Sequence, residues 1–369
     1  MQAHKDLSDL MGSCGNVKLL KLTGRTDILR EGLFYLSRIA VLIIVSTSFF
    51  SLALGFFLMF FDPEGNTFSQ TTVETLPLGF LVLFVTRVSV TAKYGVIFIS
   101  LLAIYVICFV LAWKINGGFA NALRNRAQKP ISTTGNFLFI FPVLASSLLI
   151  SVILVQQLQE VSGLPTGNID FKDWYSGLFE LAYSPIFEEV MFRISPFALY
   201  YAVRLGLRSA SKQTYNFKEY LRSLIYLVAF PDNAKQDSGL PNVKRDGIRR
   251  GLTLGEWIIM TLTSAIFGLA HYLAASGWEV GKITSSTFAG LIFSLSYLFF
   301  GFPAPIILHW FFNYYFYVFE IAAKIYQGPF ELLLDIVGFS VQIIGFAVIL
   351  ISSIYFLGKT LGNVLEPQI

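Results

Sequence analysis

The stretch Ser184-Pro-Ile-Phe-Glu-Glu-Val-Met-Phe-Arg-Ile-Ser-Pro196 places two adjacent carboxylates and an arginine in the middle of an apolar run. That run, from Trp174 to Val203, is long enough to cross a bilayer, which takes roughly 20 residues at a rise of about 1.5 Å each. A charge at the bilayer centre costs about 2.5 to 3.5 kcal/mol on insertion scales, so those that remain there are candidates for function. The stretch therefore predicts a membrane span and a polar site within it.

The rest of the chain also has the composition of a membrane protein. Hydrophobic residues make up 55% of its 369 residues and charged residues only 14%, against about 45–50% and about 25% in soluble domains. This composition excludes a disordered or collagen-like chain, and a net charge of +4 gives no argument for nucleic-acid binding. Cys14 and Cys108 lie in unlike settings and predict neither a disulfide nor a metal cluster.

Apolar runs of membrane-spanning length recur along the whole chain. Eight are found, at about Ile39 to Phe61, Tyr94 to Trp113, Phe137 to Leu158, Trp174 to Val203, Trp257 to Ala275, Ile283 to Gly301, Pro303 to Ala322 and Ile336 to Leu357. Two shorter runs, Leu76 to Thr86 and Leu221 to Pro231, are predicted to be interfacial or re-entrant. The predicted fold class is therefore all-α, a polytopic integral membrane protein with about eight transmembrane helices.

Basic residues predict the orientation of these spans. With eight spans and the N-terminus inside, the inside segments hold 21 of the 27 Lys and Arg residues and the outside segments hold 5. Because basic residues concentrate on the cytoplasmic side, both termini are predicted to be cytoplasmic, in the cell membrane if the source is prokaryotic. The loop from Arg204 to Arg250 is interpreted as a solvated inner loop held near anionic lipid, with substrate docking as the alternative.

The expected organisation has four parts. Residues 1–38 are a cytoplasmic tail, and residues 39–173 carry the first three transmembrane helices. Residues 174–322 form the functional core, which includes the cytoplasmic loop 204–256. Residues 323–369 carry the last helix and a tail.

Few ionisable side chains fall within the predicted spans, and they gather in three motifs. In the first, Glu189 and Arg193 are four residues apart with the acid first, the favoured order for a helical ion pair. Glu188 is rotated by about 100° from Glu189 and has no partner in its own turn, which suits a general base or acid. The same three charges could instead be an ion network that holds helices together. Glu180 and Glu320 lie toward span ends and are interpreted as interfacial, with a supporting role left open for Glu320.

The other two motifs are Phe267-Gly-Leu-Ala-His271 and His309-Trp-Phe-Phe-Asn313. Together with Glu188 they could hydrolyse an amide: Glu188 removes a proton from a water that His271 orients, and His309 and Asn313 hold the oxyanion. Alternatively Glu188, His271 and His309 are a His₂Glu set for a catalytic zinc, although the soluble-protease signature of two histidines flanking a glutamate is absent. Counted from the span starts, the two histidines differ in depth by roughly 12 Å, which helix tilt or a cavity below the midplane must absorb.

These three motifs, in this order on successive spans, resemble those of the CPBP intramembrane proteases. That family includes the Ras-converting CAAX prenyl endopeptidase and prokaryotic relatives tied to bacteriocin processing or self-immunity, and the resemblance covers about residues 174 to 322. It implies a helical bundle with an intramembrane cavity, and cleavage near the C-terminus of a membrane-attached substrate, prenylated or lipopeptide-like. It also implies that Glu188 and His271 activate water, that His309 and Asn313 stabilise the oxyanion, and that Glu189, Arg193 and Phe267 are positioning residues. The resemblance leaves zinc undecided.

The expected protein is therefore an intramembrane endopeptidase, glutamate- or metal-dependent, with its site open to the cytoplasm. Its expected partners are membrane lipid and a membrane-attached peptide or prenylated protein, without nucleic acid; the oligomeric state stays open. Two alternatives remain: a proton-coupled transporter, although no motif repeats between the halves, and a non-catalytic immunity or scaffold protein.

Overall fold

The computed structural model describes residues 35, 37–124, 135–169, 171, 173–212, 217–274 and 277–365, without the side chains of 208–212 and 358–365. The described residues are mostly helical, at 81%. Its elements are the first helix Ser37–Phe61, then α2 (Pro63–Gln70), β1 (Thr72–Phe80), β2 (Phe84–Lys93), α3 (Tyr94–Lys114), α4 (Phe119–Arg124), α5 (Phe137–Val161), α6 (Trp174–Glu189), η1 (Val190–Ile194), α7 (Ser195–Lys212), α8 (Phe217–Ala229), α9 (Pro231–Asp237), α10 (Val243–Gly251), α11 (Leu254–Leu273), α12 (Gly281–Phe300), α13 (Pro303–Trp310), η2 (Phe311–Tyr315), α14 (Phe316–Tyr326) and α15 (Pro329–Leu365).

Six described helices are long and apolar enough to cross a membrane. They are Ser37–Phe61, α3, α5, α11, α12 and residues Pro329–Leu357 of α15, and each coincides with a predicted span. The count of eight is not confirmed, because the other two predicted spans are each interrupted by a π-helical segment. The fourth consists of α6, η1 and α7, and the seventh of α13, η2 and α14. Such π segments occur frequently at functional sites.

The run Leu76 to Thr86 belongs to a β-hairpin, which corrects the strictly all-α prediction. Strands β1 and β2 pair antiparallel, with Phe80 opposite Phe84 across the turn. Alternating Thr and Val residues favour strand over helix in this segment, and Pro77 disfavours a helix. The backbone N–H of Val82 donates to the carbonyl of Met191 at 3.2 Å, so the hairpin is attached to η1 beside the carboxylate motif.

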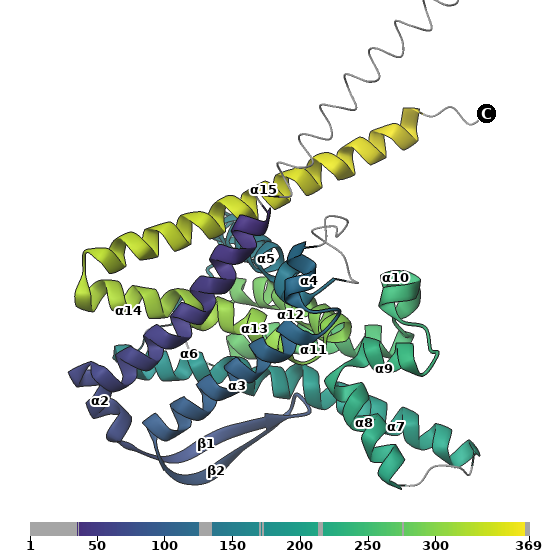
Figure 1. Ribbon diagram of the computed structural model, residues 1–369, viewed down its shortest axis with the longest axis horizontal. Helices are drawn as coiled ribbons and strands as arrows, with labels where there is room; N and C mark the ends of the chain where they lie inside the picture. The colour runs from purple at the N-terminus through teal and green to yellow at the C-terminus, as the bar shows by residue number, and fades with distance from the viewer. Residues whose placement is uncertain are drawn as a thin grey trace, which may run out of the picture.

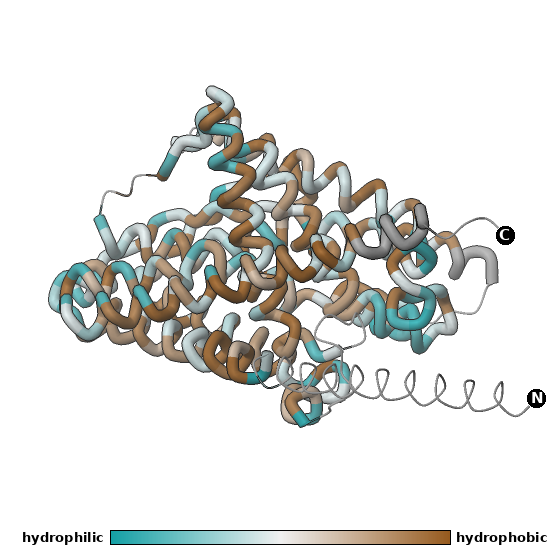
Figure 2. The backbone as a smooth tube through the Cα atoms, turned by 90° about the horizontal axis from the view of Figure 1, so that it is seen from above, coloured by the Kyte–Doolittle hydropathy of each residue, from teal (hydrophilic) through white to brown (hydrophobic). Residues whose placement is uncertain are grey.

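The core of the bundle lies around α13, which packs against α3, α6 and α12 (Figure 1). Every residue of α13 is buried, and Trp310 is fully enclosed. A Cβ on Gly268 of α11 would lie 2.4 Å from the carbonyl oxygen of Ile283, so α11 and α12 approach each other at backbone distance. Hydrophobic residues prevail along the middle of the bundle and hydrophilic residues toward its ends, as a membrane protein requires (Figure 2).

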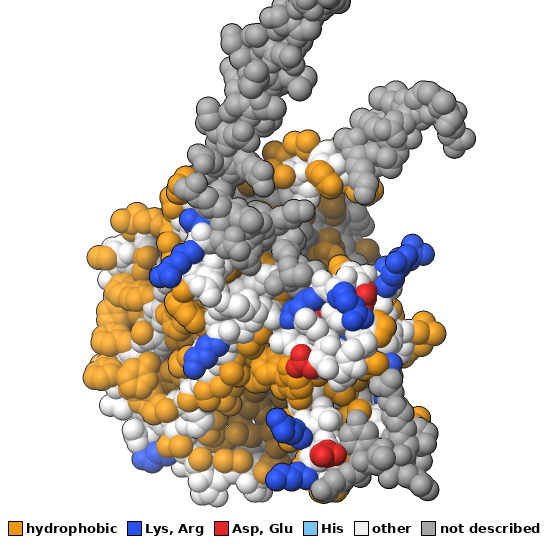
Figure 3. Space-filling model, turned by 45° about the vertical axis from the view of Figure 1, so that its right-hand side comes forward, with side chains coloured by type: hydrophobic (Ala, Val, Ile, Leu, Met, Phe, Trp, Pro, Cys, Tyr) orange, Lys and Arg blue, Asp and Glu red, His pale blue; other side chains and the backbone are white. Residues whose placement is uncertain are grey.

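The segment between α7 and α11 forms a helical cap that includes the predicted interfacial run Leu221 to Pro231, which falls mostly in α8. Figure 3 shows Lys and Arg side chains over this side of the molecule, beside a largely hydrophobic flank. In α9, Lys235 is buried, and its ammonium donates to Glu256 Oε1 at 3.1 Å and to the Gly251 carbonyl at 2.9 Å. Burial also raises the pKa of Asp232, although the N–H groups of Val243 and Lys244 oppose this by donating to it. The cap is thus joined to the first turn of α11 by a buried ion pair.

Replacing Lys235 with Met is expected to destabilise the protein by about 3–5 kcal/mol, because the buried Glu256 carboxylate would lose its ammonium partner. Thermal unfolding of the purified protein in detergent checks this. Arg245 of the same cap pairs with Asp246 through a side chain that is 55% exposed, so Arg245→Met is the control and should leave the midpoint unchanged. Equal midpoints for the two variants would contradict the prediction.

Candidate active site

The carboxylate motif lies at the end of α6. This helix begins behind Asp173, whose carboxylate accepts the backbone N–H groups of Tyr175 and Ser176, and it ends with Glu189. The chain continues without a break into η1, where the N–H of Ser195 donates to the carbonyl of Val190, five residues back. The wider π-helical turn of η1 therefore begins at Val190, directly after the two carboxylate residues.

The structure brings the three motifs together around Glu188. Its Oε2 atom lies 4.0 Å from Nε2 of His271 in α11 and 3.6 Å from Nε2 of His309 in α13. The two histidines therefore reach the same carboxylate, and the difference in depth counted from the span starts does not separate their side chains. His271 lies near the end of α11 and His309 near the end of α13, so packing of the helices brings both rings to one level.

Each imidazole is fixed by a hydrogen bond at Nδ1. Nδ1 of His271 lies 2.9 Å from the carbonyl oxygen of Phe267, and Nδ1 of His309 lies 2.8 Å from Oε1 of Glu189. A carbonyl or carboxylate oxygen only accepts, so both Nδ1 atoms carry a proton and both Nε2 atoms face Glu188. Such partners hold the orientation of each ring as well as its tautomer.

Glu189 joins Arg193 to His309. Its Oε1 atom accepts from Nη1 of Arg193 at 2.9 Å, which confirms the predicted helical ion pair, and the same atom bonds His309. Glu189 and Arg193 are fully buried. The arginine is also enclosed by aromatic rings, with its Cζ 4.1 Å from the Phe267 ring centre and 5.4 Å from that of Phe293. The pairing of Glu189 with His309 was not predicted, because no spacing in the sequence reports contacts between different helices.

Asn313 completes the site from η2. Its Nδ2 donates to Ser184 Oγ at 3.0 Å and lies 3.4 Å from Nε2 of His309. The ring of Phe293 in α12 stacks on His309 at 4.9 Å. A Cβ on Gly290 would lie 2.9 Å from Nη2 of Arg193, so a larger residue would displace the arginine. Ser184, Phe293 and Gly290 were not predicted, since none of them is an unusual residue for an apolar span.

A cavity of about 650 Å³ reaches the site. Its wall includes Glu188, His271 and Asn313, and also Lys282 in the first turn of α12. The Glu188 side chain is 20% exposed and that of His271 19%, so both are accessible from the cavity, whereas Glu189 is closed off behind them. Glu180 lines the same cavity. Glu320 instead pairs with Lys324 at 3.2 Å on the exposed surface, away from this wall.

The residues of the cavity wall also indicate from which side of the membrane a substrate would reach the site. It includes Asn168 and Phe171 of the α5–α6 connection and Trp278 of the α11–α12 connection. The count of basic residues assigns both connections to the outer side of the membrane. The cytoplasmic opening expected from the sequence therefore conflicts with the N-inside orientation, and the two expectations do not hold together.

The donor set for the zinc alternative is present, but its spacing does not fit. Ligands about 2.0–2.1 Å from a tetrahedral zinc lie about 3.3 Å from one another. The Nε2 atoms of His309 and His271 are 3.6 and 4.0 Å from Glu188 Oε2. Within the described residues, no group of three His, Cys, Asp or Glu side chains is placed to hold a metal ion. Cys108 is buried and Cys14 lies outside the described residues.

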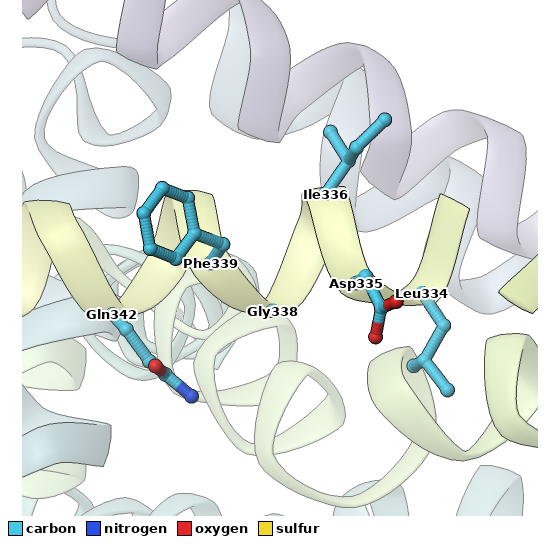
Figure 4. A pocket seen from close by; sticks show the side chains of 6 residues that line it. All are labelled: Leu334, Asp335, Ile336, Gly338, Phe339 and Gln342. Carbon is cyan, nitrogen blue, oxygen red and sulfur yellow. The ribbon is translucent and has the colours of Figure 1, made fainter. Parts of the chain in front are cut away.

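A second hollow, on the face of α15, contains none of the predicted site residues (Figure 4). It has a volume of about 610 Å³, and its wall consists of Leu334, Asp335, Ile336, Gly338, Phe339 and Gln342. All of these residues come from one helix, so it is a surface groove without converging catalytic groups.

Fold and site together define a class, a multi-pass helical membrane protein in which carboxylate and histidine side chains meet at an internal cavity. Residues 170–315 match the family model described as type II CAAX prenyl endopeptidase Rce1-like. The match covers less than half of the chain, includes all three motifs, and agrees with the resemblance drawn from those motifs. The family indicates CAAX-type protease activity. No curated protein and no solved structure matches the chain.

Proposed function

We propose that this protein is an intramembrane endopeptidase that hydrolyses a peptide bond near the C-terminus of a membrane-attached substrate, prenylated or lipopeptide-like. The observation that carries the proposal is the 4.0 Å between Glu188 Oε2 and His271 Nε2. This separation is too long for a direct hydrogen bond, but a water about 2.8 Å from each atom spans it with an angle of roughly 90°. Both atoms accept, so one water can donate a hydrogen to each.

The reaction then needs only groups of this chain. Glu188 takes a proton from the water as its oxygen attacks the carbonyl carbon, and the electron pair of the carbonyl bond moves to the carbonyl oxygen. When the tetrahedral intermediate collapses, the carbon–nitrogen bond breaks and the proton passes from Glu188 to the leaving amine. The cavity wall is mostly apolar, which strengthens the electrostatic interactions within the site.

His309 and Asn313 are proposed to stabilise the oxyanion. Because Nδ1 of His309 donates to Glu189, donation from Nε2 to an oxyanion requires the imidazolium form. Glu188 and Glu189 balance the positive charges of that imidazolium and of Arg193. The Asn313 amide, held by Ser184, supplies a neutral donor at the same place. Donors of this kind contribute about 10²–10³ in rate in other enzymes.

A cleavage assay tests the proposal. The purified protein is placed in liposomes and given a panel of prenylated and unmodified membrane-attached peptides. Cleavage near the C-terminus, mapped by mass spectrometry, is the expected result. Activity should survive a chelator; one bound equivalent of zinc together with inactivation by the chelator would support the His₂Glu alternative instead. Proton flux without hydrolysis would support a transporter. The absence of both flux and hydrolysis would support a non-catalytic immunity or scaffold role.

Both termini are proposed to be cytoplasmic.

A further inference from the structure

Lys282 places a cation in the catalytic cavity. It lies in the first turn of α12 and lines the cavity together with Glu188 and His271. It also lines a smaller hollow beside His309 and Asn313. Lys282 directly precedes the sixth apolar run, which begins at Ile283, so residue patterns along the chain place it in a connecting segment and do not indicate its contact with the site.

The ammonium of Lys282 contacts an aromatic ring and has no anionic partner among the described residues. It lies 3.6 Å from the centre of the Trp278 ring, a cation–π contact that fixes its position. Among the described residues, no carboxylate lies within ion-pair distance of it and none accepts a hydrogen bond from it, although the charge of Glu188 acts on it through space. A lysine in an apolar-walled cavity without a counter-ion favours a ligand that brings an anion.

Neutral polar groups adjoin this cation. Ser285 is one turn further along α12, on the same face as Lys282. Its Oγ accepts from Nε2 of Gln156 at 3.2 Å and donates to the backbone carbonyl of Lys282 at 3.1 Å. Gln156 lines the main cavity and Ser285 the smaller hollow, with Lys282 in both walls. A carboxylate bound to the ammonium would therefore have the second N–H of the Gln156 amide nearby for its second oxygen.

We propose that Lys282 binds the free C-terminal carboxylate of the peptide substrate. This inference rests on the proposed function, since it needs a peptide whose scissile bond lies at Glu188. A peptide cut near its C-terminus brings a carboxylate into the same cavity as the catalytic groups. Lys282 would then fix the number of residues between the scissile bond and the chain end. It is a specificity-determining residue in this proposal and takes no part in the proton transfers.

The test compares two lipid-anchored peptides of one sequence, one with a free C-terminal carboxylate and one with a C-terminal amide. The wild-type protein in liposomes is expected to favour the acid by at least about tenfold in kcat/KM, as for a hydrogen bond between charged groups. Lys282→Met should bring the ratio of acid to amide close to one, mainly by raising KM for the acid, whereas Lys282→Arg should keep most of the preference. Lys324, whose ammonium lies 3.8 Å from the Trp174 ring on the surface, is the matched control, and Lys324→Met should keep the wild-type ratio.

Two outcomes would overturn the inference. One is equal cleavage of acid and amide by the wild-type protein, which needs no variant to fold. The other is a Lys282→Met protein that loses activity on both peptides by the same factor, because the lysine would then act through Glu188 or through stability. Either result leaves the proposed function standing as long as cleavage occurs. Absence of cleavage of every peptide by the wild-type protein would refute the proposed function itself.

Discussion

Replacing Glu188 with Gln is expected to lower peptide cleavage by about 10²–10⁴-fold, the contribution that a general base makes in other enzymes. The amide keeps the size of the side chain but cannot take a proton from the water between Glu188 and His271. Glu188 lines the cavity, and in the described residues its buried Oε2 has no hydrogen-bond partner to lose, so the fold should tolerate the change. Product formation from the best peptide of the panel, measured at equal protein concentration, checks this.

Glu320→Gln is the control for this experiment, since Glu320 is an acidic residue of the same core on the exposed surface. Its activity should remain within about twofold of wild type, as surface substitutions usually perturb little. Thermal unfolding should give similar midpoints for wild type and both variants. A Glu188→Gln protein that cleaves at the wild-type rate would sink the mechanism, whatever the behaviour of the control.

Replacing Arg193 with Met is expected to destabilise the protein by about 3–5 kcal/mol, because it leaves the buried Glu189 carboxylate without its guanidinium partner. It also removes the cation that packs against the Phe267 ring. Denaturation of the purified protein in mixed detergent, followed by circular dichroism, measures the change. Activity should fall as well, since Glu189 orients His309.

A matched pair is available elsewhere in the core. Glu320 and Lys324 have the same four-residue helical spacing as Glu189 and Arg193, but they are about half exposed. Lys324→Met is therefore expected to cost less than about 0.5 kcal/mol. If Arg193→Met costs no more than Lys324→Met, the buried pair is not what stabilises this region.

A double variant separates stability from catalysis. Glu189→Leu combined with Arg193→Met removes both charges, and replacing a buried ion pair with apolar residues is often neutral for stability. Most of the lost stability should return in the double variant. Activity should stay low, because His309 loses the carboxylate that fixes its tautomer. Recovery of activity along with stability would show that Glu189 and Arg193 serve only as an ion network.

The sequence predicted much of the architecture because a bilayer imposes a length on each apolar run. All six described membrane helices coincide with predicted runs. The two runs that do not satisfy the same criterion contain Glu188 and His309, and there the helix widens into η1 and η2. Hydropathy depends on residue type and not on hydrogen-bond spacing within a helix, so it could not distinguish the π-helical segments η1 and η2 from the α-helices around them. The hairpin was missed because its apolar strands resemble a short apolar helix in hydropathy.

The sequence alone determined which residues are candidates. Charge is costly in lipid, so the few ionisable groups within apolar runs stand out, and spacing along one helix predicted the pair of Glu189 with Arg193. Only the tertiary structure decided which of these side chains contact one another between different helices. It joined Glu189 to His309, brought His271 and His309 to the Glu188 carboxylate, and placed Lys282 in the cavity. These contacts depend on the packing of α6, α11, α12 and α13, which residue spacing within any one helix does not encode.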